Sequence, residues 1–125
     1  MRYLLSIGSN APGCRQFMQK AMQWLAENFT DIESSGIYSS PALNGVTADY
    51  LNLVALGNSE LSPTDLTAAT KAFERRLGRT PESKMRGEIE IDIDIIAAGQ
   101  TILRPAEYTR SYFLRGLSLL SELHK

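Results

Sequence analysis

The stretch Glu88-Ile89-Glu90-Ile91-Asp92-Ile93-Asp94-Ile95 alternates acidic and apolar side chains without a break. Successive side chains of a β-strand point to opposite faces of a sheet, so this alternation predicts a strand, which we place at 88–96. The isoleucines would face a hydrophobic core, and the carboxylates would all face the other side. Aspartate is depleted in strands, which makes the pair Asp92 and Asp94 the most informative part of the stretch.

Two interpretations of this acidic face are open. A solvated strand whose charges deter edge-to-edge pairing explains the pattern without any ligand. Alternatively, carboxylates on one strip repel each other unless cations are present. Mg²⁺ suits such a strip, because it takes one or two carboxylates and completes its shell with water and phosphate oxygens. Two ions about 3.5–4 Å apart could be bridged by carboxylates two residues apart, as Asp92 and Asp94 are.

The segments on either side of this stretch alternate between strand and helix. We expect further strands at 2–7, 31–38 and 50–57, a helix that ends near Asn28, a second helix after Ser62, and a terminal helix at 111–123. Ser62 is a good N-cap, and Gly78 supplies the end of its helix. The order βαββαβ predicts an α+β fold, a ferredoxin-like sandwich with helices on one face of an antiparallel sheet and the other face free.

The composition is that of one domain with a hydrophobic core. The chain has 125 residues, of which 43% are hydrophobic and 22% charged, so we expect a single domain over 1–125. A net charge of −1 argues against nucleic acid or a membrane surface as partner, and no apolar run approaches the ~18 residues of a membrane span. The single cysteine, Cys14, and an opening apolar run that stops at Gly8 favour a cytoplasmic protein. No obligate protein partner is evident.

Other residues offer binding chemistry with less specific patterns. A loop and strand holding Tyr50 and Asn52 could stack on and hydrogen-bond a flat heterocycle, although the residues alone favour a sheet aromatic beside a turn-forming asparagine. Arg79 opens the loop before the acidic strand, and the planar fork of arginine suits phosphate. Most of the other arginines are expected on a solvated surface.

Taken in order, these segments resemble the 6-hydroxymethyl-7,8-dihydropterin pyrophosphokinase family, folate-pathway enzymes that transfer pyrophosphate from ATP to a pterin alcohol and release AMP. The matching segments are 3–10, 38–43, 49–52, 61–63, 74–79, 91–95 and 110–114. Each is weak alone, but seven in the right order with similar spacing are specific. On this basis the chain is identified as a divergent and shortened member, and the family's ferredoxin-like α+β fold agrees with the predicted order of elements.

The resemblance implies a role for each matching segment. The residues that would bind the pterin are Ser40, Pro41, Leu43, Tyr50, Asn52 and Tyr112. Those that would lie near the nucleotide are Glu74, Arg79 and Arg86. Those that would take part in catalysis are Asp92, Asp94, Arg79 and Arg110. Within these sets, the two tyrosines would sandwich the pterin ring, and the two aspartates would hold two Mg²⁺ ions that bridge the phosphates of ATP.

The chain departs from the family pattern just before Asp92. Family members usually carry Arg-Trp-Gly-Pro-Arg-Thr there, whereas this chain has Met-Arg-Gly-Glu-Ile-Glu at 85–90, so Ile89 replaces an arginine. The family's Pro-His pair is also missing, and Arg-Pro-Ala-Glu at 104–107 stands near that place. We therefore expect weak nucleotide binding and slow turnover. Two alternatives stay open: a relative that binds a pterin-like heterocycle or a metal without efficient transfer, and an unrelated ferredoxin-like interaction domain.

Overall fold

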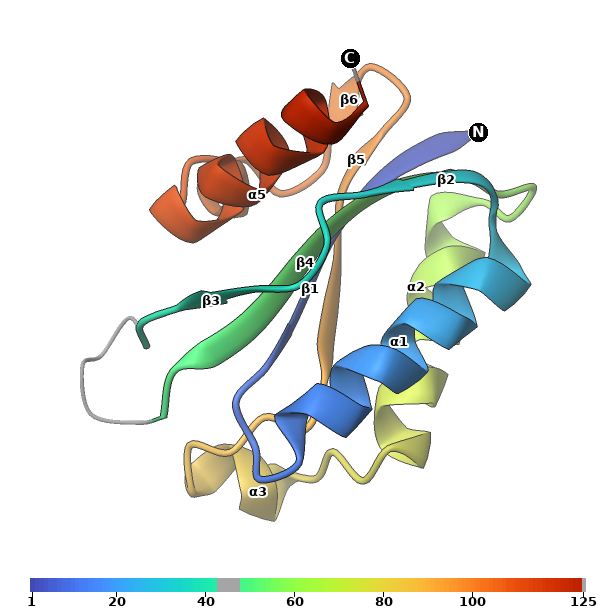
Figure 1. Ribbon diagram of the computed structural model, residues 1–125. Coiled ribbons are helices and arrows are strands. Elements are labelled where there is room, and N and C mark those ends of the chain that lie inside the picture. The colour runs from blue at the N-terminus through green and yellow to red at the C-terminus, as the bar shows by residue number, and fades with distance from the viewer. Residues whose placement is uncertain (43–47, 125) are drawn as a thin grey trace.

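An antiparallel sheet runs through the molecule, with helices packed on both of its faces (Figure 1). The computed structural model describes residues 1–42 and 48–124. The elements are β1 (Arg2–Ser9), α1 (Cys14–Asn28), β2 (Thr30–Ser34), β3 (Tyr38–Ser40), β4 (Tyr50–Asn58), α2 (Pro63–Arg76), α3 (Pro81–Met85), β5 (Asp92–Ala98), β6 (Thr101–Ile102), α4 (Pro105–Tyr108) and α5 (Ser111–Leu123). No helix among these is long and apolar enough to cross a membrane.

The strand order confirms the predicted α+β, ferredoxin-like fold. The strands lie in the order β2-β4-β1-β5-β6, with β3 also paired to β4, and all the pairs are antiparallel. The central strand β1 sets the register of its two neighbours. Gly8 pairs with Asn52 of β4 on one side and with Asp92 of β5 on the other. Directly paired residues share a face, so this register brings the predicted pterin and metal residues to one face of the sheet.

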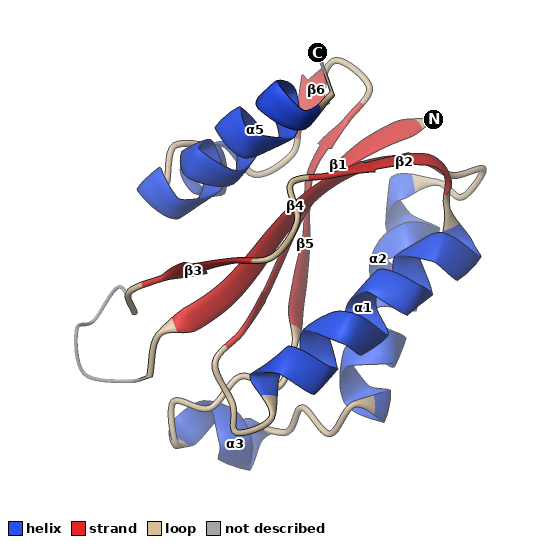
Figure 2. Cartoon of the chain, viewed as in Figure 1, coloured by secondary structure: helices blue, strands red, loops and turns tan. Residues whose placement is uncertain are grey.

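Two hydrophobic clusters hold the layers together. Helices α1 and α2 cover one face as predicted, and they bury the larger cluster, to which Trp24, Phe73 and Ile93 belong. Helix α5 lies across part of the opposite face, where Phe113 packs against Val54 in the second cluster (Figure 2). The expectation that this second face would be free is therefore wrong, because α5 covers part of it.

The acidic strand is shorter than its alternating pattern predicts. β5 begins at Asp92 rather than at Glu88, because the chain before it is hydrogen-bonded to the loop that follows β1. The side chain of Asn10 accepts a hydrogen bond from the backbone N–H of Ile89 at 2.6 Å, and the Asn10 N–H donates to the Ile89 carbonyl at 3.0 Å. Glu88 pairs with Arg86 at 3.2 Å. The four carboxylates thus do not form one strip, and only the two aspartates remain on the strand.

The predicted strand at 31–38 is also two strands. The chain leaves the sheet after β2 at Ser34 and returns at Tyr38, and Gly36 between them has a φ of 74°, which interrupts an extended backbone. The second of these strands, β3, extends beyond the predicted end at residue 38 to Ser40. The helix predicted after Ser62 is confirmed, with the Ser62 hydroxyl accepting from the Asp65 N–H at 3.2 Å, and so is the terminal helix at 111–123.

Candidate active site

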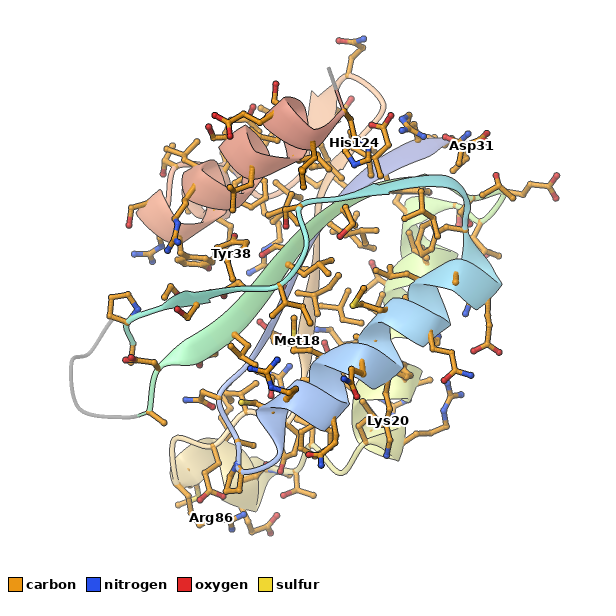
Figure 3. All side chains as sticks on the ribbon, in the orientation of Figure 1. Met18, Lys20, Asp31, Tyr38, Arg86 and His124 are labelled. Atoms are coloured by element: carbon orange, nitrogen blue, oxygen red, sulfur yellow. The ribbon has the colours of Figure 1, made fainter. Side chains whose placement is uncertain are left out.

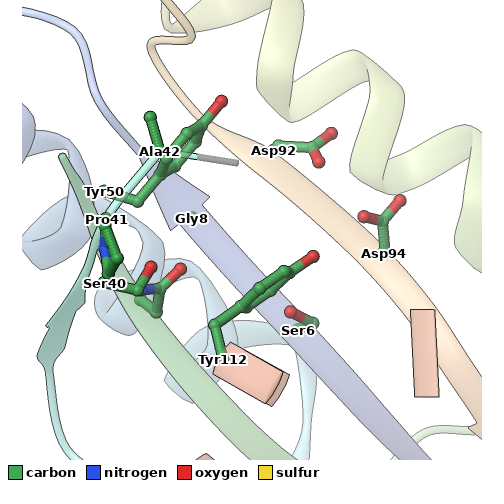
Figure 4. Close-up of a pocket in the computed structure, with 10 residues that line it drawn as sticks. Ser6, Gly8, Ser40, Pro41, Ala42, Tyr50, Asp92, Asp94 and Tyr112 are labelled. Atoms are coloured by element: carbon green, nitrogen blue, oxygen red, sulfur yellow. The ribbon is translucent and has the colours of Figure 1, made fainter. Parts of the chain in front are cut away.

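A cavity of about 240 Å³ lies on the face of the sheet beside α5 (Figure 4). Its walls are Ser6, Gly8, Ser40, Pro41, Ala42, Tyr50, Asn52, Asp92, Asp94 and Tyr112. In Figure 4 the two aspartates follow β5 on one side of β1, and Ser40 and Tyr50 lie on the other. The cavity thus joins both predicted metal ligands to five of the six residues predicted to bind a pterin, and the sixth, Leu43, lies outside the described residues.

The floor of the cavity is open because β1 carries small residues there. Ser6 pairs with Asp94 and Gly8 with Asp92, so both lie between the aspartates and β4. A Cβ atom added to Gly8 would come within 3.4 Å of the Tyr50 ring and 3.5 Å of the Asn52 amide oxygen. A larger side chain at this position would occupy the space between β4 and the acidic pair.

A buried amide forms one side of the cavity. The side chain of Asn52 is only 4% exposed, and its Nδ2 donates a hydrogen bond to the Ser40 hydroxyl at 2.7 Å. This bond fixes the plane of the amide. Since the group carries two N–H donors and one acceptor oxygen, it keeps hydrogen-bonding capacity for the edge of a flat ligand.

Two hydrogen bonds hold Tyr112 in place, one made by its ring hydroxyl and one by its backbone. Its hydroxyl donates to the carboxylate of Glu107 on α4, and its backbone carbonyl accepts from the Tyr38 hydroxyl at 2.7 Å. Burial raises the pKa of Tyr112, and the hydrogen bond to Glu107 adds to this effect, so the phenol stays protonated as a donor. Tyr38 lies beneath α5 (Figure 3) and ties the start of that helix to the sheet. The sequence pattern gave no indication of Glu107.

Each of the two aspartates is paired with an arginine. Asp92 Oδ1 lies 2.6 Å from Arg79 Nη1, and Asp94 Oδ1 lies 3.1 Å from Arg104 Nη1. Burial, together with the negative charge of Asp92, raises the pKa of Asp94 to about 7, while Arg104 opposes the shift. The two carboxylates are thus close enough to penalise each other's charge, which is the condition under which a divalent cation is favoured.

The donor set of this pair fits Mg²⁺. It consists of carboxylate oxygens, the ligands that hard cations prefer. Within residues 1–42 and 48–124, no group of three or more His, Cys, Asp or Glu side chains surrounds a common point. A cation held by Asp92 and Asp94 would therefore complete its shell with water and ligand oxygens, as Mg²⁺ does in sites that bind phosphates.

Glu74 supports the acidic strand from beneath. This carboxylate is 3% exposed; it accepts a hydrogen bond from the Ile93 N–H at 2.8 Å and lies 3.0 Å from Arg79 Nη1. Arg79 in turn binds Asp92 and donates to the Ile91 carbonyl at 3.3 Å. Glu74 and Arg79, both predicted to lie near a nucleotide, thus meet at the acidic pair, where Glu74 holds Arg79 in place.

A second cavity, of about 180 Å³, shares Asp94 with the first. It is lined by Thr67, Thr70, Lys71, Ile93, Asp94, Ile95, Leu103 and Arg104. Lys71 and Arg104 bring two cations to it from α2 and from the start of α4. Sequence reasoning missed this cavity, because apart from the β5 segment its residues come from α2 and from the start of α4, and these belong to no matching segment.

Among the described residues that line these two cavities, four predicted site residues are not found: Glu74, Arg79, Arg86 and Arg110. Glu74 and Arg79 still contact the acidic strand, as described above. Arg86 lies beside α3 at the outer end of the molecule (Figure 3), where it borders a separate hollow near Asn10. Arg110 is exposed at the N-cap of α5. Glu88 and Glu90 also leave the acidic face, and Glu90 accepts from the Ser83 hydroxyl at 3.0 Å.

Comparison with known proteins connects this geometry to one family. The "Folate synthesis bifunctional protein" of Chlamydia caviae is 33% identical over 102 residues, which are 76% of this chain and 23% of that protein. The "2-amino-4-hydroxy-6-hydroxymethyldihydropteridine pyrophosphokinase" of Aquifex aeolicus is 33% identical over 102 residues, 80% of this chain and 62% of that protein. The protein of the same name from Porphyromonas gingivalis is 33% identical over 103 residues, 74% of this chain and 65% of that protein.

The chain thus spans less than two thirds of the length of each of these relatives. The family model that matches it is described as 7,8-dihydro-6-hydroxymethylpterin-pyrophosphokinase, and the match runs over residues 4–122. It includes every element from β1 to α5 that forms the two cavities. The chain therefore belongs to the 7,8-dihydro-6-hydroxymethylpterin-pyrophosphokinase family.

Proposed function

We propose that this chain transfers pyrophosphate from ATP to the hydroxymethyl group of 6-hydroxymethyl-7,8-dihydropterin, in folate biosynthesis, and releases AMP. The observation that carries the proposal is the first cavity, where Tyr50, Tyr112 and a buried amide lie beside two carboxylates. Aromatic walls and a buried amide suit a flat, polar-edged heterocycle, and adjacent carboxylates suit a metal-bound phosphate. The binding site for the heterocycle and the binding site for the metal-bound phosphate are thus adjacent in this cavity.

In the proposed complex the pterin lies between Tyr50 and Tyr112. Asn52 and the backbone of Ser40 and Pro41 bind its edge, where buried polar groups reject a ring that leaves them unpaired. The hydroxymethyl group then points away from β4, toward β5 and its aspartates. This orientation follows from the register, because Asn52 and Asp92 both pair with Gly8.

The nucleotide occupies the second cavity in this proposal. Lys71 and Arg104 supply positive charge for its phosphates, and the threonines of α2 supply hydroxyl groups. Asp94 borders both cavities, so the transferred group passes over it. The pterin hydroxyl oxygen forms a bond to the β-phosphorus and loses its proton to solvent. The bond from that phosphorus to the oxygen shared with the α-phosphorus breaks, and AMP leaves with the electron pair.

The acidic pair would hold Mg²⁺, with two ions expected when ATP is bound. Such ions supply neutralisation of the phosphate charge. The chain's own contribution is positioning: Arg79 and Glu74 hold Asp92 against α2, and the ring of Tyr112 is held by Glu107. Phosphoryl transfer depends chiefly on such positioning and on charge stabilisation. No side chain in the cavity serves as an evident general base among the described residues.

The proposal is tested by calorimetry and by AMP release. The parent protein is titrated with 6-hydroxymethylpterin, then with a non-hydrolysable ATP analogue and Mg²⁺, and a coupled assay follows AMP in parallel. Pterin binding, Mg²⁺-dependent nucleotide binding and AMP formation are all expected. Binding of neither ligand would overturn the proposal.

A relative that binds without efficient transfer is the second candidate. It is favoured by Ile89, which offers no cation where the family pattern has arginine, and by the position of Arg86 outside both cavities. This candidate predicts pterin and nucleotide binding in calorimetry with no AMP above the rate of the uncatalysed mixture. The same two assays therefore separate it from the transferase.

A further inference from the structure

The two arginines on the acidic pair are held in different ways. Arg79 has three partners, namely Asp92, Glu74 and the Ile91 carbonyl, and its side chain is 22% exposed. Arg104 is 49% exposed, and within the described part of the chain Asp94 is the one ionic partner of its side chain. Arg79 is thus a fixed part of the strand's support. The half-exposed guanidinium of Arg104, in contrast, can leave Asp94, whose own side chain is 13% exposed, and remain in contact with solvent.

From its position Arg104 can contact either the Asp94 carboxylate or a ligand in the second cavity. It stands at the N-cap of the short helix α4 and lines the second cavity together with Lys71. Lys71 is engaged with Glu74, Nζ to Oε1 at 3.3 Å. Arg104 therefore presents the least constrained positive charge at the border between the two cavities.

The arginine that the family pattern carries just before the acidic pair is missing in this chain. Ile89 stands where it would be, and this residue is held to the loop after β1 by Asn10. Arg86, three residues earlier, pairs with Glu88 and lines a different hollow. A polyphosphate beside Asp94 would thus depend on positive charge that comes from α2 and from the start of α4.

We propose that Arg104 is a phosphate-binding residue that exchanges partners. In the metal-free protein it pairs with Asp94, and when a Mg²⁺-nucleotide binds it releases that carboxylate and binds phosphate oxygens. This inference rests on the proposed function and adds to it the residue that replaces the missing cation.

The exchange follows from competition for one carboxylate. A divalent cation at Asp92 and Asp94 uses the Asp94 carboxylate that now faces Arg104, and it offsets the negative charge that attracts this arginine. The released guanidinium then meets phosphate oxygens, for which its planar fork is well suited. Arg104 therefore opposes binding of the metal alone and favours binding of the metal with a nucleotide.

These two opposite effects give the test. Arg104→Met removes the charge and keeps a flexible stem, and Arg75→Met removes one charge from the exposed face of α2 as a matched control. Calorimetry with Mn²⁺ or Mg²⁺ alone is expected to show severalfold tighter binding by Arg104→Met than by the parent. Titration with Mg²⁺ and a non-hydrolysable ATP analogue is expected to show affinity reduced by about tenfold or more. Arg75→Met should match the parent in both.

Each possible result decides the proposal. Equal nucleotide affinity in Arg104→Met and the parent would reduce Arg104 to a surface ion pair, and unchanged metal affinity would overturn the exchange. Arg104→Lys keeps the charge without the fork, and it should retain the parent's weak metal binding with only part of the nucleotide affinity. A parent that binds pterin but no Mg²⁺-nucleotide would overturn this inference, and a parent that binds neither would overturn the proposed function as well.

Discussion

Asp92 and Asp94 are the residues on which the proposed chemistry depends most directly. They are the two carboxylates that remain on the strand after Glu88 and Glu90 turn away, and both line the first cavity. We expect Asp92→Asn and Asp94→Asn each to abolish Mg²⁺-dependent nucleotide binding, because a neutral amide is a poor ligand for a hard cation. Calorimetry measures this loss. Glu88→Gln is the control and should bind as the parent does; equal binding by all three variants would place the metal elsewhere.

Tyr112 offers a second prediction at the scale of one side chain. Tyr112→Ala should weaken pterin binding by about 1–3 kcal/mol, the magnitude found when an aromatic ring that stacks on a base is removed. Tyr112→Phe keeps the ring and loses only the bond to Glu107, so it should lose much less. Titration of both variants with the pterin separates stacking from hydrogen bonding, and an unchanged affinity in Tyr112→Ala would exclude the ring from the site.

Helix α5 positions one wall of the cavity, and its approach to the sheet depends on Gly116. A Cβ atom there would lie 2.1 Å from the Tyr38 hydroxyl oxygen and 2.4 Å from a Val54 methyl group, so Gly116→Ala must move the helix. We expect destabilisation of about 1–3 kcal/mol, as for other overpacked cores, together with weaker pterin binding because Tyr112 moves too. Urea unfolding and pterin titration measure the two effects. Ser118→Ala, on the exposed side of α5, should change neither.

The elements also show how far the sequence predicts this protein. Periodicity and caps identify the helix after Ser62 and the terminal helix, because those determinants are local. The start of β5 could not be predicted, since the alternation continues to Glu88 while Asn10, far away in the sequence, takes the hydrogen bond of Ile89. Tertiary contacts here override a local pattern.

The whole molecule brings together residues that no local pattern connects. The six residues predicted to bind the pterin all lie in matching segments, and five of them meet in one cavity. Arg104 and Glu107 could not be found in this way, because they act through contacts between α4 and other elements. The second cavity likewise exists only when α2, β5 and the start of α4 are packed together.

Packing the acidic pair against α2 and the sheet links the stability of the whole fold to pH. Burial and the charge of Asp92 raise the pKa of Asp94 from 3.8 to about 7. Between these two values the folded protein holds a proton that the unfolded chain has lost, so the free energy of unfolding contributed by this group falls as pH rises toward 7. The full contribution is present below pH 3.8 and is lost above about pH 7.

We therefore expect the metal-free parent to lose more stability between pH 5 and pH 8 than Asp94→Asn, because the amide of the variant does not titrate. These two pH values lie on either side of the Asp94 pKa of about 7. Urea unfolding at the two pH values measures the difference. Mg²⁺ should recover part of the parent's stability at the higher pH, because it binds the ionised carboxylates of the folded state. The same addition should leave Asp94→Asn nearly unchanged. If the two proteins instead showed the same pH dependence, Asp94 would carry its charge at neutral pH without penalty, and the repulsion that favours a cation at this pair would be absent.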